Sequence, residues 1–374
     1  MKKVLIVIAI VAVVVLAIVL ATWTKTSSPQ LSEIKLGVIL ELTGPLARLG
    51  ENARRGIELA VEEINTANKE NEKIVLVIED DKSDPKEGVS AFRKLINTYH
   101  FPIIIGATGS SIVMSCAPIA NENKTVLFSV GATSPLITNA GDYIFRNRLS
   151  GALEVKAMAD FAAKKLNIKK IALLYINTDY GTGNKDVFIE AYKKVDGEVI
   201  LAEGFDQGET DFKSILTKVK QLNIEGVYII AVGENGYILR QAREMGINTQ
   251  FLSTVGIEGP ELWKIAGNAA NGVIFTVQKF DASSSQKAEH FSNNYLSKYG
   301  EGPDLFSALG YDAIYIVSKV VNEDGYNSDS IKKGLYNLCN FQGVIGNVSF
   351  DKNGDIQSEV MMKIAKDGKF VPYQ

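Results

Sequence analysis

From Ile34 onward, short and nearly continuous apolar stretches alternate with longer stretches in which apolar residues recur every three or four positions. Residues 34–40, 74–80 and 102–106 show the first pattern, which is typical of buried β-strands. Residues 53–65 show the second pattern, which predicts an amphipathic helix. Strands that are apolar on both faces and alternate with helices are typical of parallel sheets covered by helices. The chain is therefore predicted to be an α/β protein with doubly wound parallel sheets.

The pattern restarts after residue 150, which predicts a second layered unit of the same kind. The expected strands are residues 34–40, 74–80, 102–106, 125–130, 143–146, 171–176, 198–204, 226–232, 250–253 and 273–277. The expected helices are residues 53–65, 85–98, 110–121, 151–165, 184–195, 211–221, 235–244, 284–299, 306–322 and 328–337. Beyond residue 344, alternating side chains around the turn at 351–355 predict a hairpin, and the acid spacing in this turn does not match a calcium loop.

The N-terminal segment has the composition of a membrane-targeting signal. Lys2 and Lys3 precede an unbroken apolar run from Val4 to Ala21. This run is longer than the hydrophobic region of a secretory signal peptide and long enough to span a bilayer. The lysines place the N-terminus in the cytoplasm and the rest of the chain outside. Because Ala21 offers a poor cleavage site, an uncleaved anchor is favoured over a cleaved signal peptide. We expect a protein tethered to the outer face of the cytoplasmic membrane, or a secreted or periplasmic one if the segment is cleaved.

Composition and motifs exclude several classes of function. The 40 Lys and Arg residues are balanced by 43 Asp and Glu without a basic stripe, so no nucleic-acid partner is expected. The two histidines and two cysteines are too few for a transition-metal cluster, and the sequence leaves open whether Cys116 and Cys339 pair. Residues 181–183 lack the third glycine of a dinucleotide fingerprint, and no nucleophile elbow occurs. We predict a protein that is not an enzyme and uses no cofactor or metal.

Two hydroxyl-rich turns follow neighbouring predicted strands. Ser110 and Ser111 follow the strand at 102–106 and open a helix, and Thr133 follows the strand at 125–130. A helix N-terminus offers unpaired N–H groups and the positive end of a dipole to an anion. In doubly wound folds, ligands bind at the carboxyl ends of the strands. These turns are predicted to bind a ligand carboxylate; the alternative is two ordinary capped turns.

Several short motifs resemble the type I periplasmic binding proteins of the Leu/Ile/Val-binding kind, in order along residues 34–373. They are Leu36–Pro45, Gly56–Ala60, Asp80–Lys86, Ala107–Ser111, Tyr180-Gly181, Ile238–Ala242 and Phe350–Asp355. The resemblance implies two lobes joined by three hinge crossovers near residues 150, 277 and 346, with a small-molecule ligand between them. The implied division is residues 1–33 as the membrane segment and tether, 34–150 plus 278–345 as lobe 1, and 151–277 plus 346–374 as lobe 2. It also implies a receptor that delivers solute to the permease of an ABC transporter.

The resemblance further implies which residues contact the ligand. The ligand carboxylate is expected to contact Ser110, Ser111, Thr133 and the backbone of Gly131. Lobe 2 contributes the aromatic residue Tyr180, and Tyr311 is a further aromatic residue near the ligand. The loop after the first strand contributes Leu46, Arg48 and Leu49.

Two positions depart from the pattern of this family. The glutamate that binds a ligand ammonium falls on Val255, and the aspartate after the first crossover falls on Gly151. Either Glu258 or Glu234 replaces them, or the ligand is not an α-amino acid. The leading interpretation is a binding protein for a branched-chain or other hydrophobic amino acid. The alternatives are a receptor for a small carboxylate without an ammonium group, and a ligand-sensing ectodomain.

Overall fold

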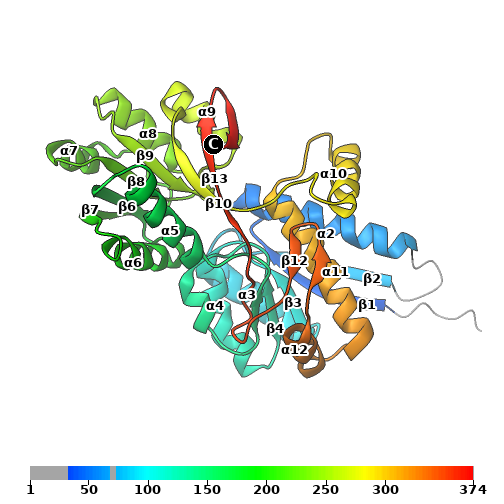
Figure 1. Ribbon diagram of the computed structural model, residues 1–374. Coiled ribbons are helices and arrows are strands. Elements are labelled where there is room, and N and C mark those ends of the chain that lie inside the picture. The colour runs from blue at the N-terminus through cyan, green and yellow to red at the C-terminus, as the bar shows by residue number, and fades with distance from the viewer. Residues whose placement is uncertain (1–32, 68–72, 374) are drawn as a thin grey trace, which may run out of the picture.

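The computed structural model describes residues 33–67 and 73–373, which form two layered α/β units side by side (Figure 1). The first unit is built on a five-stranded sheet in the order β2-β1-β3-β4-β5, and all its pairings are parallel. Its strands are β1 (Glu33–Leu40), β2 (Lys73–Asp80), β3 (Ile103–Gly106), β4 (Val126–Ser129) and β5 (Ile144–Arg146). The α/β class with parallel sheets, predicted from the sequence, is confirmed.

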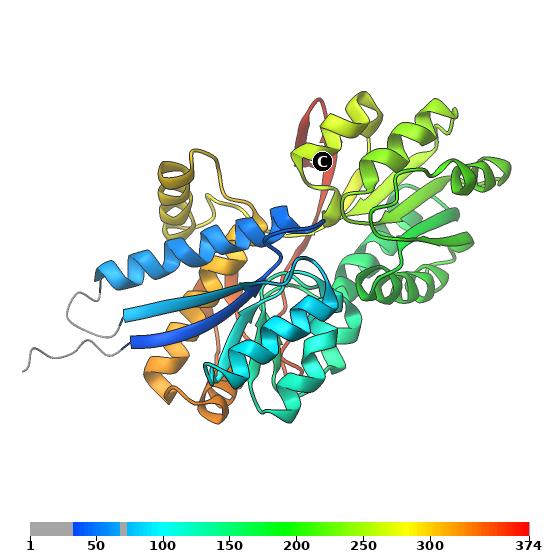
Figure 2. The same cartoon turned by 180° about the vertical axis from the view of Figure 1, so that it is seen from behind.

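Helices cover both faces of the first sheet, and Figure 2 shows α2 and α3 on either side of β1 and β2. Alternate side chains of β1 enter two different cores: Leu36 and Val38 pack in one, and Ile39 packs in the other with Phe92 of α3. This explains the continuous apolar character of the strand. The helices of this unit are α2 (Ala47–Ala67), α3 (Pro85–Asn97), α4 (Ser110–Glu122), α10 (Gln286–Tyr299), α11 (Leu305–Asp324) and α12 (Ser328–Asn337).

The helices α2 and α11 pack with their backbones in contact. A Cβ atom on Gly56 would lie 1.9 Å from the carbonyl oxygen of Ser307, and one on Gly310 would lie 2.3 Å from that of Ala53. Only glycine permits so close an approach. The contact fixes the position of α2 against α11.

The second unit is built on a seven-stranded sheet in the order β14-β13-β10-β9-β8-β6-β7. Its first five strands in chain order are parallel: β6 (Lys170–Ile176), β7 (Glu198–Phe205), β8 (Gly226–Ile230), β9 (Gln250–Thr254) and β10 (Ile274–Gln278). Its helices are α5 (Gly151–Asp160), α6 (Asp179–Lys193), α7 (Lys213–Gln221), α8 (Asn235–Glu244) and α9 (Pro260–Ala266). The carboxyl ends of both sheets face the space between the units, which is where ligands bind in such folds.

The C-terminal tail differs from its predicted form. Strands β13 (Val360–Lys366) and β14 (Lys369–Pro372) add to the second sheet in antiparallel orientation, so this edge of the sheet is mixed, and the tail forms a hairpin that turns at residues 367–368 instead of 351–355. A two-residue turn connects β13 to β14, and such a short connection permits only antiparallel pairing of the two strands. A separate small hairpin is formed by β11 (Phe341–Gly343) and β12 (Gly346–Val348).

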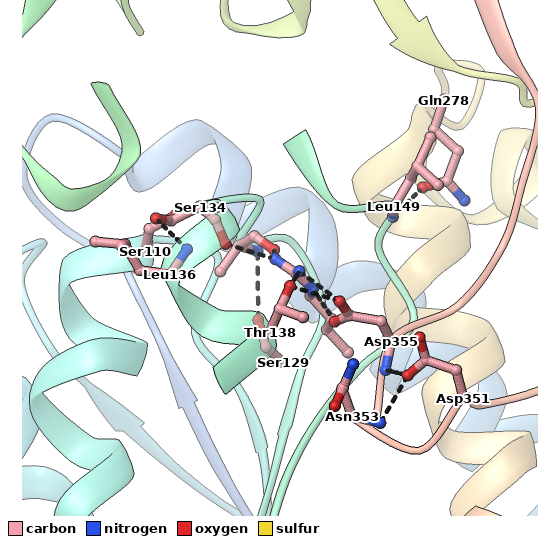
Figure 3. Close-up of polar contacts among 12 residues, drawn as sticks. Ser110, Ser129, Ser134, Leu136, Thr138, Leu149, Gln278, Asp351, Asn353 and Asp355 are labelled. Carbon is pink, nitrogen blue, oxygen red and sulfur yellow. Dashed lines mark hydrogen bonds and ion pairs between the residues drawn. The ribbon is translucent and has the colours of Figure 1, made fainter. Parts of the chain in front are cut away.

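The segments on either side of the turn at 351–355 form fewer β-bridges than the predicted hairpin would. Only a single antiparallel bridge, between Phe350 and Ile356, flanks it. The Asp351 carboxylate instead accepts hydrogen bonds from the backbone N–H groups of Asn353 and Asp355, which closes the turn (Figure 3). The turn therefore serves to present Asp355 to the first unit.

Buried polar contacts join the segments through which the chain passes between the units. The Arg146 guanidinium, at the end of β5, forms an ion pair with Asp355 over a distance of 2.6 Å and donates to the Ser134 carbonyl. Gln278, at the end of β10, accepts from the backbone N–H of Leu149 (Figure 3) and from the Arg148 guanidinium. These contacts fix the first, second and third connections to one another.

Some sequence expectations concern features beyond these elements. Across residues 33–67 and 73–373, no helix is long and apolar enough to cross a membrane. The segment Val4–Ala21 lies outside the described residues. Cys116 is buried, Cys339 is exposed, and both are free thiols, so the two do not pair.

Candidate functional site

A cavity of about 540 Å³ lies between the two units, at the carboxyl ends of both sheets. Its size suits a small organic ligand. Most of its wall is apolar, and the polar groups gather at the start of α4 and α6. The predicted site residues that line it are Leu46, Leu49, Ser110, Ser111, Gly131, Thr133, Tyr180 and Val255.

The start of α4 forms the polar end of the cavity. The first N–H groups of a helix have no acceptor inside the helix, and Gly109 before this helix supplies no side-chain cap. The Ser110 hydroxyl oxygen accepts from the backbone N–H of Ser134, and the Ser111 hydroxyl oxygen accepts from that of Asp179. Both hydroxyl protons are left to donate elsewhere. Together with the helix dipole they favour an anion at this end.

A buried carboxylate that sequence reasoning missed lies directly behind this loop. Glu41, at the end of β1, accepts hydrogen bonds from the N–H groups of Thr108 and Gly109 and from the Thr108 hydroxyl. Its side chain is completely buried, and this burial raises its pKa. Asp81 lies nearby, and burial together with the Glu41 charge raises the pKa of Asp81 to about 8. Glu41 therefore holds the backbone that leads into Ser110.

Tyr180, in the first turn of α6, forms the wall contributed by the second unit. Its hydroxyl lies 2.6 Å from the hydroxyl of Thr254 at the end of β9. Burial raises the pKa of Tyr180, so the side chain stays a neutral phenol at neutral pH. Tyr180 presents an aromatic face and one hydrogen-bonding group opposite the serine turn.

Arg48 and Glu258 lie beside the cavity and bind protein groups instead of lining it. The Arg48 guanidinium reaches from α2 to the second unit, where it donates to the carbonyl of Glu258 over 2.7 Å and lies 3.5 Å from the Glu261 carboxylate. The Glu258 carboxylate is paired with Lys363 of β13 at 2.5 Å. These contacts bridge the two units next to the cavity.

Tyr311 and Glu234 are also placed away from the cavity wall. The hydroxyl of Tyr311 donates to Glu63 of α2, and its ring packs on Phe291 of α10. Glu234 is buried, and one of its carboxylate oxygens accepts from the backbone N–H of Gly208. Burial raises the pKa of Glu234.

Gly151 has no room for a side chain. A Cβ atom there would lie 2.2 Å from the amide oxygen of Asn184 and 2.8 Å from the carbonyl oxygen of Thr133. The backbone N–H of Gly151 donates to that same carbonyl. This position therefore cannot accept an acidic residue without local rearrangement.

Comparison with known proteins agrees with this arrangement. The family model described as periplasmic binding protein matches residues 33–369. The Leu/Ile/Val-binding protein homolog 2 of Brucella abortus is 31% identical, over 92% of this chain and 94% of the relative. A leucine-binding protein LivK from Thermotoga maritima is 31% identical with a TM-score of 0.86, over 91% and 98% of the two chains. LivJ from Streptococcus pneumoniae, solved in complex with isoleucine, is 31% identical with a TM-score of 0.83, over the same shares. The chain belongs to the periplasmic binding protein family.

Proposed function

We propose that this protein is the extracytoplasmic solute receptor of an ABC importer and binds a branched-chain or other hydrophobic amino acid between its two units. The observation that carries the proposal is the polarity of the cavity. Hydroxyls and helix N–H groups gather at the start of α4, and apolar side chains such as Leu49, Ile112 and Phe306 line the rest. The Leu/Ile/Val-binding relatives support the same ligand class.

In this proposal, the ligand carboxylate accepts hydrogen bonds from the start of α4 and from Thr133, and the ligand side chain is buried among the apolar residues. Burial of a four-carbon side chain contributes roughly 2–3 kcal/mol. The lobes correspond to residues 34–150 plus 278–345 and residues 151–277 plus 346–374, and they close about the three connections. The receptor binds its solute without converting it and passes it to the permease.

Changing Ser110→Ala together with Thr133→Ala is expected to weaken ligand binding by well over tenfold. Each hydrogen bond to a charged group contributes about 1.5–3 kcal/mol, and both hydroxyls line the polar end of the cavity. Calorimetric titration with leucine, isoleucine and valine measures the change. Ser297→Ala, at an exposed position on α10, is the matched control and should leave affinity unchanged. An unaltered affinity in the double variant contradicts the assigned carboxylate position.

A second ligand class is favoured by one observation, the apolar side chain of Val255 in the cavity wall. A carboxylate without an ammonium group needs no acidic partner there. Competition between leucine and 4-methylpentanoate, its deaminated counterpart, separates the two classes. Stronger binding of the amino acid supports the first class, and equal binding supports the second.

We also propose that the segment Val4–Ala21 stays on the mature protein and tethers it to the membrane. The length of the apolar run and its poor cleavage site support this. Mass spectrometry of the protein extracted from membranes is expected to give the mass of a chain that contains this segment. A mass that corresponds to a start at Thr22 or later contradicts the tether.

A further inference from the structure

We infer that Asp179 binds the ammonium group of the ligand and thereby makes the site selective for amino acids over simple carboxylates. This inference rests on the proposed function, which places the ligand carboxylate at the start of α4. Asp179 begins α6 in the second unit, and it lines the cavity. Nothing in the sequence pattern had singled it out.

Other acidic positions are closed to this role. Val255 is apolar, and Gly151 has no room for a side chain beside Asn184. The carboxylate of Glu258 is paired with Lys363 outside the cavity. Glu234 is turned to the N–H of Gly208 and is absent from the cavity wall. Among the described residues that form this wall, Asp179 carries the sole carboxylate, and no Lys, Arg or His is present.

The backbone of Asp179 is fixed against the serine turn. Its N–H donates to the hydroxyl of Ser111 over 3.1 Å, and its carbonyl accepts from the hydroxyl of Ser134 over 2.7 Å. The ammonium of an α-amino acid is attached to the carbon next to its carboxylate, so its acceptor must lie close to the group that binds the carboxylate. Asp179 meets this requirement because its backbone N–H contacts Ser111 and both residues line the same cavity.

The local electrostatics also require an acid at this place. The helices α4 and α6 both begin at the cavity, and the N-terminus of each carries a positive partial charge that disfavours a cation. In the described part of the chain, no hydrogen-bond donor or cationic group is paired with the Asp179 carboxylate, and the residue as a whole is half-buried. The negative charge of Asp179 is therefore available to an ammonium. Since it comes from the second unit, the contact also draws the two units together around the ligand.

An acidic residue in the first turn of a helix also stabilises that helix, so the experiment must separate the two roles. Asp179→Asn keeps the shape of the side chain and removes its charge. We would titrate the variant and the native protein with leucine, isoleucine, valine and phenylalanine, each paired with its deaminated acid. The variant should bind the preferred amino acid at least tenfold more weakly, with the affinity for the deaminated acid unchanged or increased. Asp186→Asn, at an exposed position further along α6, is the matched control and should leave both affinities unchanged.

Three results would overturn the inference. They are an unchanged amino-acid affinity in Asp179→Asn, an equal loss for the amino acid and its deaminated counterpart, and equal binding of both compounds by the native protein. In each of these cases the carboxylate site of the proposed function still stands. If the native protein binds neither compound, the proposed function itself fails, and this result is distinct from the other three.

Discussion

Asp355→Ala is expected to lower the free energy of unfolding by about 3–5 kcal/mol, because it leaves a buried guanidinium without its charged partner. Arg146 is completely buried, and both of its hydrogen bonds to the Asp355 carboxylate would be lost. The variant also releases the turn at 351–355 from the first unit. Urea denaturation followed by tryptophan fluorescence and circular dichroism measures the change.

The matched control for this experiment is Glu359→Gln, which breaks the exposed ion pair with Lys279 near the same connections. Exposed pairs contribute about 0–1 kcal/mol, so the control should unfold at nearly the native urea concentration. A similar small effect in Asp355→Ala would show that the buried pair is not required for stability. That result would also remove the argument that the connections are fixed to one another.

Asp81→Asn is expected to stabilise the protein at pH 8.5 by an amount on the order of a few kcal/mol. Burial beside Glu41 raises the pKa of Asp81 from 3.8 to about 8. The folded state therefore binds more protons than the unfolded state between about pH 4 and pH 8, so native stability falls as the pH rises through this range. The variant lacks this titration, and its advantage should shrink as the pH is lowered to 5.

Denaturation at a series of pH values tests this expectation. Asp196→Asn is the control, because Asp196 is exposed and its positive φ of 59° is one that asparagine adopts as readily as aspartate. Its pH profile should match that of the native protein. An Asp81→Asn variant that is less stable than the native protein at pH 8.5 would mean that the carboxylate is charged and stabilising where it lies.

Much of the fold was predictable because strand and helix periodicity is a local property of the chain. The helix α8 was predicted at 235–244 and begins and ends at these residues. The start of α6 was predicted five residues too late, at residue 184. Gly181 and Gly183 have low helix propensity, whereas the Thr178 hydroxyl caps the helix and both glycines are buried in it. A Cβ atom on Gly181 would lie 1.9 Å from the carbonyl of Ile176, so the glycine is required by packing.

The residue pattern by itself predicted only the part of the site whose chemistry is local, and the family resemblance added Tyr180, Leu46 and Leu49. Ser110, Ser111 and Thr133 follow strands directly, and turn position alone brings them to the cavity. Glu41 and Asp179 gain their roles from contacts 67 and 68 residues away in sequence, which no local pattern records.

The direction of the Tyr311 side chain depends on how α11 is rotated about its own axis. The spacing of residues in the sequence did not predict this rotation. The rotation of α11 directs this side chain to Glu63 and Phe291, inside the core of the first unit. Arg48 is near the cavity as expected, but it engages the second unit. Arg48 lies in the first turn of α2, and a residue at the start of a helix beside a site can thus serve the contact between units instead of the ligand.

The bonds that cross between the units affect how long a ligand stays bound as well as how the units are positioned. In the proposed receptor, the units must separate before a ligand can leave the cavity, and separation breaks the contacts of the Arg48 guanidinium with the Glu258 carbonyl and with the Glu261 carboxylate. None of these bonds needs to involve the ligand, yet each contributes to the barrier that slows its escape. The residence time of a solute in this receptor is therefore governed in part by protein groups that the solute never touches, and two solutes of unequal affinity share that component of the delay.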